Sequence, residues 1–465
     1  AASVKQNFTL EAGTYVCSYR IKKMNADVGD DSKVLKGYIR RSAGSTEQQV
    51  TAGEIGTIYT SGTKSQWHTK RSLLSETAYT TVSFQFKVAA ADDGELFHVF
   101  IALQPDETGS PLYIDNVSMH IQEDAWIFLK DKPDKATFIN NPLKMLSQRA
   151  LDRRSKLAIP IDFIDVPVDE TYYNQIKNDG NLTVLAKSKW LNAIHIQGQV
   201  EYINNLLSTY SFIDNIEFAN KSLNTFGKST TNSKTIISNH HNKFNETLTD
   251  FNYGDADNQI KMLKGDYLHD QGLTGEGQVI AIIDGGFPNV NILEAFQRIR
   301  DNNQILGGYN FADRNENFYT RSSHGTHVLS TVAGYLENEF VGTAPDAKFY
   351  LFISEIAETE TVLEETLWVE AAERADSLGV DVINTSLGYT TYDNPNHSHT
   401  YADLDGKTTF ITRGAEIGAS RGMLLVNAAG NSGSSSWKYI GAPADAPSVI
   451  TVGAVNASGE MASFS

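Results

Sequence analysis

Three patterns of apolar and polar positions follow one another along the 465 residues. In residues 1 to about 121, short stretches either alternate apolar and polar side chains or run apolar, and no long helical period occurs. Examples are residues 13–19, 80–88 and 96–103, with the turn residues Asp92-Asp93-Gly94 before the last. Such stretches predict an all-β sandwich over residues 1–121.

Residues 124–218 predict a small α+β unit. Strands are expected at residues 126–129, 182–185, 191–196 and 212–216, and helices at residues 141–155 and 200–207. The resulting order, β-α-β-β-α-β, is that of a ferredoxin-like fold.

Residues 219–252 are rich in Ser, Thr, Asn and Lys. These residues bury too little apolar surface to form a core, so we expect a linker, and exposed linkers are where proteases cut. His240 and His241 are adjacent here, but no Cys or carboxylate pattern around them supports a metal site.

From Tyr253 to Ser465, apolar strands alternate with helices. Strands are expected at residues 279–283, 349–353, 380–383 and 423–426, and an amphipathic helix at residues 362–378. Continuous apolar strands between helices predict a parallel sheet. In such sheets functional sites collect at the C-terminal ends of the strands.

Asp284 and His324 are the first candidates for chemistry. Asp284 directly follows the strand 279–283, where it could also simply cap a turn. His324 and His327 follow a pair of serines that could cap a helix. Zinc proteases have a Glu directly after the first His and a spacing of four, and neither holds here. We therefore interpret His324 as catalytic and His327 as structural.

Two further segments follow predicted strands. The turn 427–433 holds Asn431 next to Gly430, which suits an amide donor to an oxyanion. Residues 384–388 follow the strand 380–383, and their backbone could pair with an extended peptide. Either segment alone could be an ordinary strand–loop junction.

In this order, at the ends of parallel strands, these segments resemble the subtilisin-like serine proteases over residues 253–465. The motifs that carry the resemblance are Asp284-Gly285-Gly286, residues 323–328, Thr385-Ser386-Leu387-Gly388, Ala428-Ala429-Gly430-Asn431 and residues 448–454. The resemblance implies a serine endopeptidase in which Asp284 orients His324, His324 moves the proton of the serine, and Asn431 donates to the oxyanion. It also implies a pocket for the substrate residue before the scissile bond, lined by Ser386, Leu387, Gly388, Ala428, Ala429 and Gly430.

Two features depart from the family. Gly285 stands where members usually carry Ser or Thr, which removes one hydrogen bond at most. The family's nucleophile belongs to a Gly-Thr-Ser block that would lie downstream of Ser465, and Ser465 itself lacks that context. We therefore expect a truncated catalytic domain, inactive without the downstream serine.

The two N-terminal regions carry resemblances of their own. Residues 128–133, 146–154 and 188–193 resemble the propeptide of secreted Bacteroidetes-type subtilases, an inhibitor and folding aid. Without that context, the Arg-rich helix among them would be a solvated face. Residues 112–119 resemble the last strand of jelly-roll carbohydrate-binding modules, which implies glycans as ligands. A sandwich that only spaces or packs is the open alternative.

The amino-acid composition limits the classes of partner that we expect for the protein. The net charge of −17 argues against nucleic acid, and no apolar run is long enough to span a bilayer. The single cysteine, Cys17, is expected to be a structural strand residue. The family resemblance implies peptide or protein substrates and the chain's own propeptide as a partner. It also implies a secreted bacterial protein, although no signal peptide is visible. For the chemistry it implies no cofactor, and it implies structural calcium at unknown sites.

Two other functions stay open. The chain could be an inactive subtilase scaffold used for binding, or a glycan-binding protein acting through the N-terminal sandwich. The presence of both Asp284 and His324 favours the enzyme.

Overall fold

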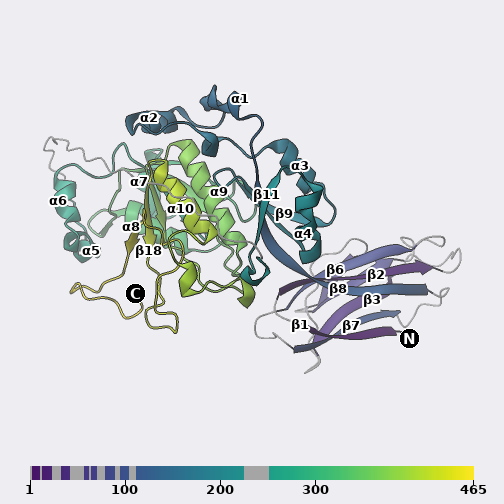
Figure 1. Cartoon of the computed structure of the whole chain (residues 1–465). Helices are drawn as coiled ribbons and strands as arrows, with labels where there is room; N and C mark the ends of the chain where they lie inside the picture. The colour runs from purple at the N-terminus through teal and green to yellow at the C-terminus, as the bar shows by residue number, and fades with distance from the viewer. Residues whose placement is uncertain are drawn as a thin grey trace.

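The computed structural model describes residues 3–10, 13–23, 33–41, 57–61, 64–70, 79–88, 95–103, 112–224 and 251–465. Figure 1 shows the N-terminal strands at one end of the molecule and the large α/β domain at the other, with the α+β unit against it. No helix in these residues is long and apolar enough to cross a membrane.

The N-terminal region contains two antiparallel sheets. One has the order β1-β7-β3-β5-β4, and the other begins β6-β2-β8. Their bounds are β1 (Ser3–Leu10), β2 (Gly13–Lys23), β3 (Lys33–Arg41), β4 (Thr57–Ser61), β5 (Lys64–Lys70), β6 (Thr80–Val88), β7 (Glu95–Leu103) and β8 (Leu112–Leu129). Cys17 lies in their apolar core beside Tyr19 and Phe86. Burial raises the pKa of its thiol to about 12, which fits a structural residue.

Strand β8 joins this region to the α+β unit without a break. Its 18 residues include both stretches that the sequence predicts as separate strands. The first part pairs with β2 through Gln122, and the second pairs with β10 (Ala193–Gln199) and β11 (Ile213–Phe218). The expected boundary near residue 121 therefore falls inside one continuous strand.

The strands of the α+β unit follow one another as expected, but three α-helices rather than one lie between β8 and β9, and the helix at residues 170–177 is not predicted by the sequence. Its strands lie in the order β9-β10-β8-β11, each antiparallel to its neighbour. The other elements are α1 (Lys135–Ile139), the 3-10 turn Pro142–Lys144, α2 (Gln148–Lys156), the 3-10 turn Phe163–Asp165, α3 (Glu170–Lys177), β9 (Leu182–Ser188) and α4 (Val200–Thr209).

The helix expected at residues 141–155 differs from the prediction in two ways. It begins only at Gln148, because the hydroxyl of Ser147 accepts a hydrogen bond from Ala150 N at 3.2 Å and caps α2 there. In addition, Arg153 and Arg154 are buried, so the Arg-rich helix is not the solvated face that its composition alone indicates.

The α/β domain is built on a parallel sheet, as predicted, and the sheet has six strands, two more than the sequence analysis names. Its spatial order is β13 (Ile305–Asn310), β16 (Lys348–Ile353), β12 (Val279–Asp284), β17 (Val382–Thr385), β18 (Leu424–Ala428) and β19 (Ile450–Val452). Alternate residues of β12 pack into two different apolar cores. Ala281 and Ile283 pack with α9 (Leu363–Leu378) and α10 (Phe410–Ser420), whereas Ile280 and Ile282 pack with α8 (His324–Ala333).

Smaller elements complete the domain. They are α5 (Asp257–Met262), α6 (Gly265–Asp270), α7 (Gln297–Asp301), the hairpin β14 (Tyr335–Leu336) and β15 (Phe340–Val341), and the 3-10 turns Glu294–Phe296, Pro395–His397 and Tyr401–Asp403.

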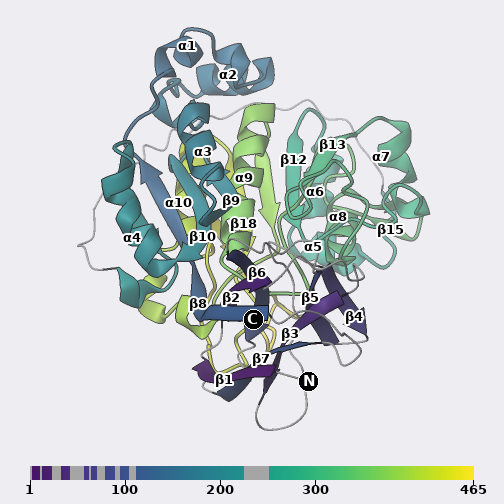
Figure 2. The same ribbon diagram turned by 90° about the vertical axis from the view of Figure 1, so that its right-hand side faces the viewer.

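The sheet of the α+β unit lies against α9 and α10 (Figure 2). The indole N–H of Trp126 donates to Thr366 Oγ1 at 2.9 Å, and its ring stacks on Phe410 at 4.9 Å. The buried carboxylate of Glu373 accepts from Trp190 N at 2.9 Å and from Ser188 Oγ at 2.6 Å. The helices that cover the parallel sheet are thus themselves covered by the α+β unit.

The expected linker 219–252 is only partly described. Residues 221–223 form a 3-10 turn, and Lys221 Nζ pairs with Asp403 Oδ2 at 2.8 Å. Residues 225–250, including His240 and His241, lie outside the described residues.

Candidate active site

Asp284 occupies the end of β12, near the middle of the parallel sheet. Its side chain is fully buried, and Oδ1 accepts hydrogen bonds from Gly285 N at 2.7 Å and His324 Nδ1 at 2.8 Å. Oδ2 is buried without a hydrogen-bond partner within the described parts of the chain. A fixed carboxylate that faces an imidazole holds the ring in one orientation and one tautomer.

His324 is the first residue of α8, where the sequence predicts a helix start. The hydroxyl of Ser322 accepts from His324 N at 3.2 Å. Gly325 is needed here, because a Cβ at this position would lie 2.5 Å from Gly286 O and 2.9 Å from Asp284 Cβ. The glycine therefore lets α8 approach the end of β12 closely enough for His324 and Asp284 to meet.

The imidazole of His324 can work as a base. Its side chain is 51% exposed, and Nδ1 faces Asp284, so a ring with its proton on Nδ1 leaves Nε2 as an acceptor. The hydrogen bond to Asp284 raises the pKa of His324, burial opposes this, and the charges of Asp284 and Glu355 add to the rise. Among the residues that the structure describes, none hydrogen bonds to Nε2.

Glu355 is a site residue that the sequence analysis missed. It follows β16, and Ser354 N donates to Asp284 O at 3.1 Å, which holds the two strand ends together. The space where a Cβ on Gly285 would lie is occupied by Glu355 Oε2. Burial, and then the charge of Asp284, raises the pKa of the Glu355 carboxyl. The glycine that departs from the family pattern thus makes room for a second carboxyl group beside the pair.

The signal that could have identified Glu355 is its position. Like Asp284, it is a charged residue just after an apolar run at the C-terminal edge of a parallel sheet, with only Ser354 between it and the strand.

The predicted substrate-binding segments lie at the same edge. The register pairs Ile283 with Thr385 and Thr385 with Asn427, so the segments after β17 and β18 emerge beside the end of β12. Asn427 Nδ2 donates to Leu387 O at 3.2 Å and links the two segments. Ser386, Gly388, Ala428, Ala429, Gly430 and Asn431 are half-buried or exposed, and Leu387 is buried.

Asn431 and His327 have different surroundings from those of the pair. Asn431 is exposed on the segment after β18, and no described atom lies within 4 Å of a Cβ added at the neighbouring Gly430. His327 is exposed on α8, and its interpretation as structural stays a prediction. No group of three or more His, Cys, Asp or Glu side chains in the described ranges is arranged to hold a metal ion.

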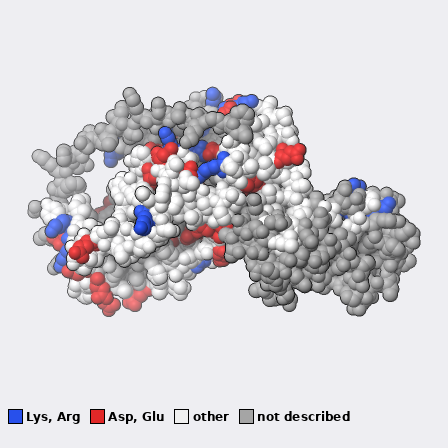
Figure 3. Space-filling view, turned by 60° about the horizontal axis from the view of Figure 1, so that its bottom comes forward, with Lys and Arg blue, Asp and Glu red and all other residues white. Residues whose placement is uncertain are grey.

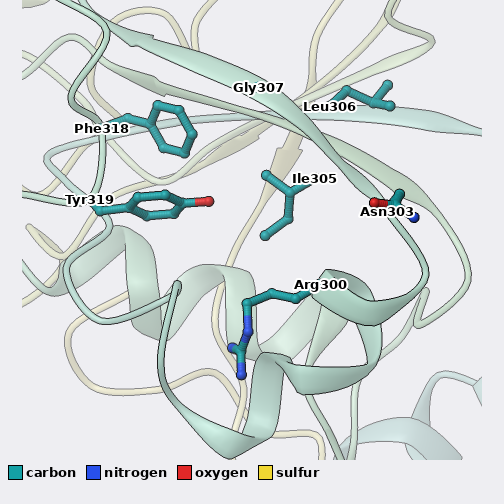
Figure 4. Close-up of a pocket in the computed structure, with 7 residues that line it drawn as sticks. All are labelled: Arg300, Asn303, Ile305, Leu306, Gly307, Phe318 and Tyr319. Atoms are coloured by element: carbon teal, nitrogen blue, oxygen red, sulfur yellow. The ribbon is translucent and has the colours of Figure 1, made fainter.

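The surface has two further features, a group of acidic side chains and a separate cavity. In Figure 3 the lower side of Figure 1 comes forward, and acidic side chains gather near the middle of that face. A separate cavity of about 300 Å³ lies at the edge strand β13 (Figure 4). It is lined by Arg300, Asn303, Ile305, Leu306, Gly307, Phe318 and Tyr319. None of the predicted site residues lines this cavity.

Comparison with known proteins finds relatives for two regions of the chain. Residues 275–465 match the family model of the subtilase family, and residues 124–236 match the peptidase S8 propeptide domain of Bacteroidota. Subtilisin E of Bacillus subtilis is 35% identical over 214 residues, covering 44% of this chain and 48% of that protein. Subtilisin of Bacillus pumilus is 34% identical over 214 residues, covering 44% and 66%.

Among solved structures, the epidermin leader peptide processing serine protease of Staphylococcus aureus aligns with a TM-score of 0.44 and 17% identity, covering 74% of this chain and 72% of that chain. The chain spans about half the length of subtilisin E. Residues 275–465 are thus similar to the subtilase family, and residues 124–236 are similar to the peptidase S8 propeptide domain of Bacteroidota.

Proposed function

We propose that this chain is part of the precursor of a secreted serine endopeptidase, with Asp284 and His324 as two members of its catalytic triad. The observation that carries the proposal is the 2.8 Å hydrogen bond from His324 Nδ1 to the buried Asp284, with the ring half exposed at the C-terminal edge of the sheet. His324 Nε2 takes the proton of the attacking serine and then passes it to the leaving amine, while Asp284 stabilises the imidazolium.

The nucleophile in this proposal is a serine downstream of Ser465. Ser465 Oγ accepts a hydrogen bond from Ala454 N at 2.7 Å, an arrangement that ties it to the backbone rather than to His324. Residues 1–465 should accordingly lack peptidase activity.

The substrate strand in this proposal runs along residues 386–388. An extended peptide would pair with this backbone and place its residue before the scissile bond between residues 386–388 and 428–430. Asn431, exposed at the same edge, would donate its amide to the oxyanion. A catalytically inactive binding scaffold is not favoured, because it would not require a buried carboxylate paired with a half-exposed imidazole.

Residues 124–218 act as the inhibitor and folding aid of the catalytic domain in this proposal, and processing occurs between Asn220 and Tyr253. The contacts of Trp126 with α9 and α10, and the hydrogen bond from Trp190 N to Glu373 of α9, support a propeptide that holds the catalytic domain until it is cut away. Glycan binding by the N-terminal sheets stays a prediction from the sequence.

The test is hydrolysis of a protein substrate by the chain extended past Ser465 to its natural stop. We expect activity in the extended chain and a loss of about 10⁶ in kcat for His324→Ala, the size established for subtilisin itself. His327→Ala, on the exposed side of the same helix, is the matched control and should stay active. An extended His324→Ala chain with normal hydrolysis contradicts the proposal.

A further inference from the structure

Helix α2 of the propeptide lies far from the substrate edge of the catalytic domain. It sits at the end of α9 where β17 begins, which is the opposite edge of the parallel sheet (Figure 1, top). Ser147 N donates to Ser377 O at 2.8 Å. A Cβ on Gly379 would lie only 2.7 Å from Ala150 N, so the helix and this turn are in close backbone contact.

Three arginines of α2 bind the turn between α9 and β17. Arg149 Nε donates to Gly379 O at 2.9 Å and Nη2 donates to Gly277 O at 3.0 Å. The same guanidinium forms an ion pair with Asp381.

The other two arginines converge on Asp376. Arg153 pairs with this carboxylate and also donates to Val380 O. Arg154 Nη2 lies 2.8 Å from Asp376 Oδ2 and 2.8 Å from Asp165 Oδ1. The side chain of Asp376 is fully buried and that of Arg154 is 1% exposed.

The chemistry of this turn suits guanidinium groups. The last carbonyls of a helix have no partner within the helix and form the negative end of its dipole. Here Asp376 O in the last turn of α9, and Gly379 O and Val380 O just after the helix, accept from the arginines, and two carboxylates complete the set. Arginine offers five donors in a rigid fork, whereas lysine offers a single compact charge, so the two are not equivalent here.

The segment from Ser147 to Asp162, called here the propeptide arm, continues from α2 across the next turn of the catalytic domain. A Cβ on Gly422, which follows α10, would meet Leu157 Cδ1 at 2.5 Å and Ile159 Cδ1 at 2.9 Å. Arg421 Nη1 lies 3.1 Å from Asp162 Oδ1. The segment from Ser147 to Asp162 therefore spans both helix–strand turns that precede the substrate-binding strands.

We propose that this edge of the catalytic domain is an arginine-binding site, separate from the substrate cleft, that anchors the propeptide through α2. Its ligand is a helix that presents arginines at positions i, i+4 and i+5, and the propeptide arm supplies them as Arg149, Arg153 and Arg154. This inference rests on the proposed function in one respect: the propeptide can be released only after processing has cut the chain. Release would leave the Asp376 carboxylate and three carbonyls at this turn without their guanidinium partners.

The test measures release of the propeptide from the folded full chain. A cleavage sequence for a site-specific protease is inserted between residues 225 and 250, the chain is cut after folding, and the dissociation rate of the N-terminal fragment is followed by fluorescence anisotropy. We expect Arg153→Lys and Arg149→Ala each to speed dissociation about tenfold or more, because each removes guanidinium donors from a carboxylate and from carbonyls of this turn. Lys156→Ala, an exposed change on the same helix, is the matched control and should leave the rate unchanged.

A synthetic peptide of residues 141–159 provides the second measurement. In large molar excess it should lower the bound fraction of the N-terminal fragment, and the same peptide with lysine at positions 149, 153 and 154 should not. Unchanged dissociation in Arg149→Ala overturns the proposal even if Arg153→Lys fails to fold, because Arg149 is half exposed. Equal competition by both peptides also overturns it.

Neither measurement needs peptidase activity. A failure of the proposed catalytic function would therefore leave these outcomes readable, and a failure here would leave hydrolysis by the extended chain unaffected.

Discussion

Substitution of Gly379 tests how closely the propeptide approaches the catalytic domain. Gly379 has φ +83° and ends α9, a position that favours glycine. Alanine in a left-handed conformation costs about 1–2 kcal/mol, and the gain from a stiffer unfolded chain returns about 0.4–1 kcal/mol. The backbone cost of Gly379→Ala alone is therefore about 1 kcal/mol.

The propeptide adds a second cost at this position. The new Cβ would lie 2.7 Å from Ala150 N and 2.8 Å from Arg149 Cβ, and one of these contacts is with backbone that cannot rotate away. Such overpacking costs about 1–3 kcal/mol more. The matched control is Gly459→Ala, because Gly459 has φ +80° and no described atom within 4 Å of an added Cβ.

The assay is urea denaturation of the full chain, followed by tryptophan fluorescence. Gly459→Ala should lower the free energy of unfolding by about 1 kcal/mol, and Gly379→Ala should lower it by about 1–3 kcal/mol more than that. Equal losses in the two variants would show that α2 does not press on this turn, and the close contact would then be refuted.

Three further predictions concern the extended enzyme. Glu355→Gln should lower the pKa of His324, because it removes a negative charge that favours the imidazolium. The acid limb of the profile of kcat/KM against pH should therefore move to lower pH, and an unmoved limb would contradict the electrostatic effect of Glu355 on His324. Asn431→Ala should lower kcat by about 10²–10³ with KM little changed, the loss established for one oxyanion donor in subtilisin itself, and steady-state kinetics with near-normal kcat would remove Asn431 from the site. N-terminal sequencing of the mature enzyme should find a cut between Asn220 and Tyr253 that is absent in His324→Ala, and a cut elsewhere would contradict the assigned processing region.

Much of the catalytic domain could be predicted because its determinants are local. Apolar runs such as residues 279–283 fix strands that are buried on both faces, and the observed sheet is parallel as expected. Asp284 and His324 were found because both sit at the ends or starts of strongly patterned elements, and the structure brings them within hydrogen-bond distance.

Other features depend on contacts between distant segments. The partners of Arg153 and Arg154 could not be predicted, since nothing near them in the sequence reveals Asp376, more than two hundred residues later. Glu355 was missed for the same reason, because only the fold brings its carboxyl group over Gly285. Strand β8 was divided in two, since the pattern changes where its neighbours change from β2 to β10 and β11.

The proposed function requires that His324 serves a serine downstream of Ser465. Labelling with a serine-reactive fluorophosphonate probe, with the modified residue identified by mass spectrometry, tests this requirement. We expect no label on residues 1–465, label on a single downstream serine in the extended chain, and loss of that label in His324→Ala. Label on Ser465, or label on the extended chain that survives His324→Ala, would contradict it.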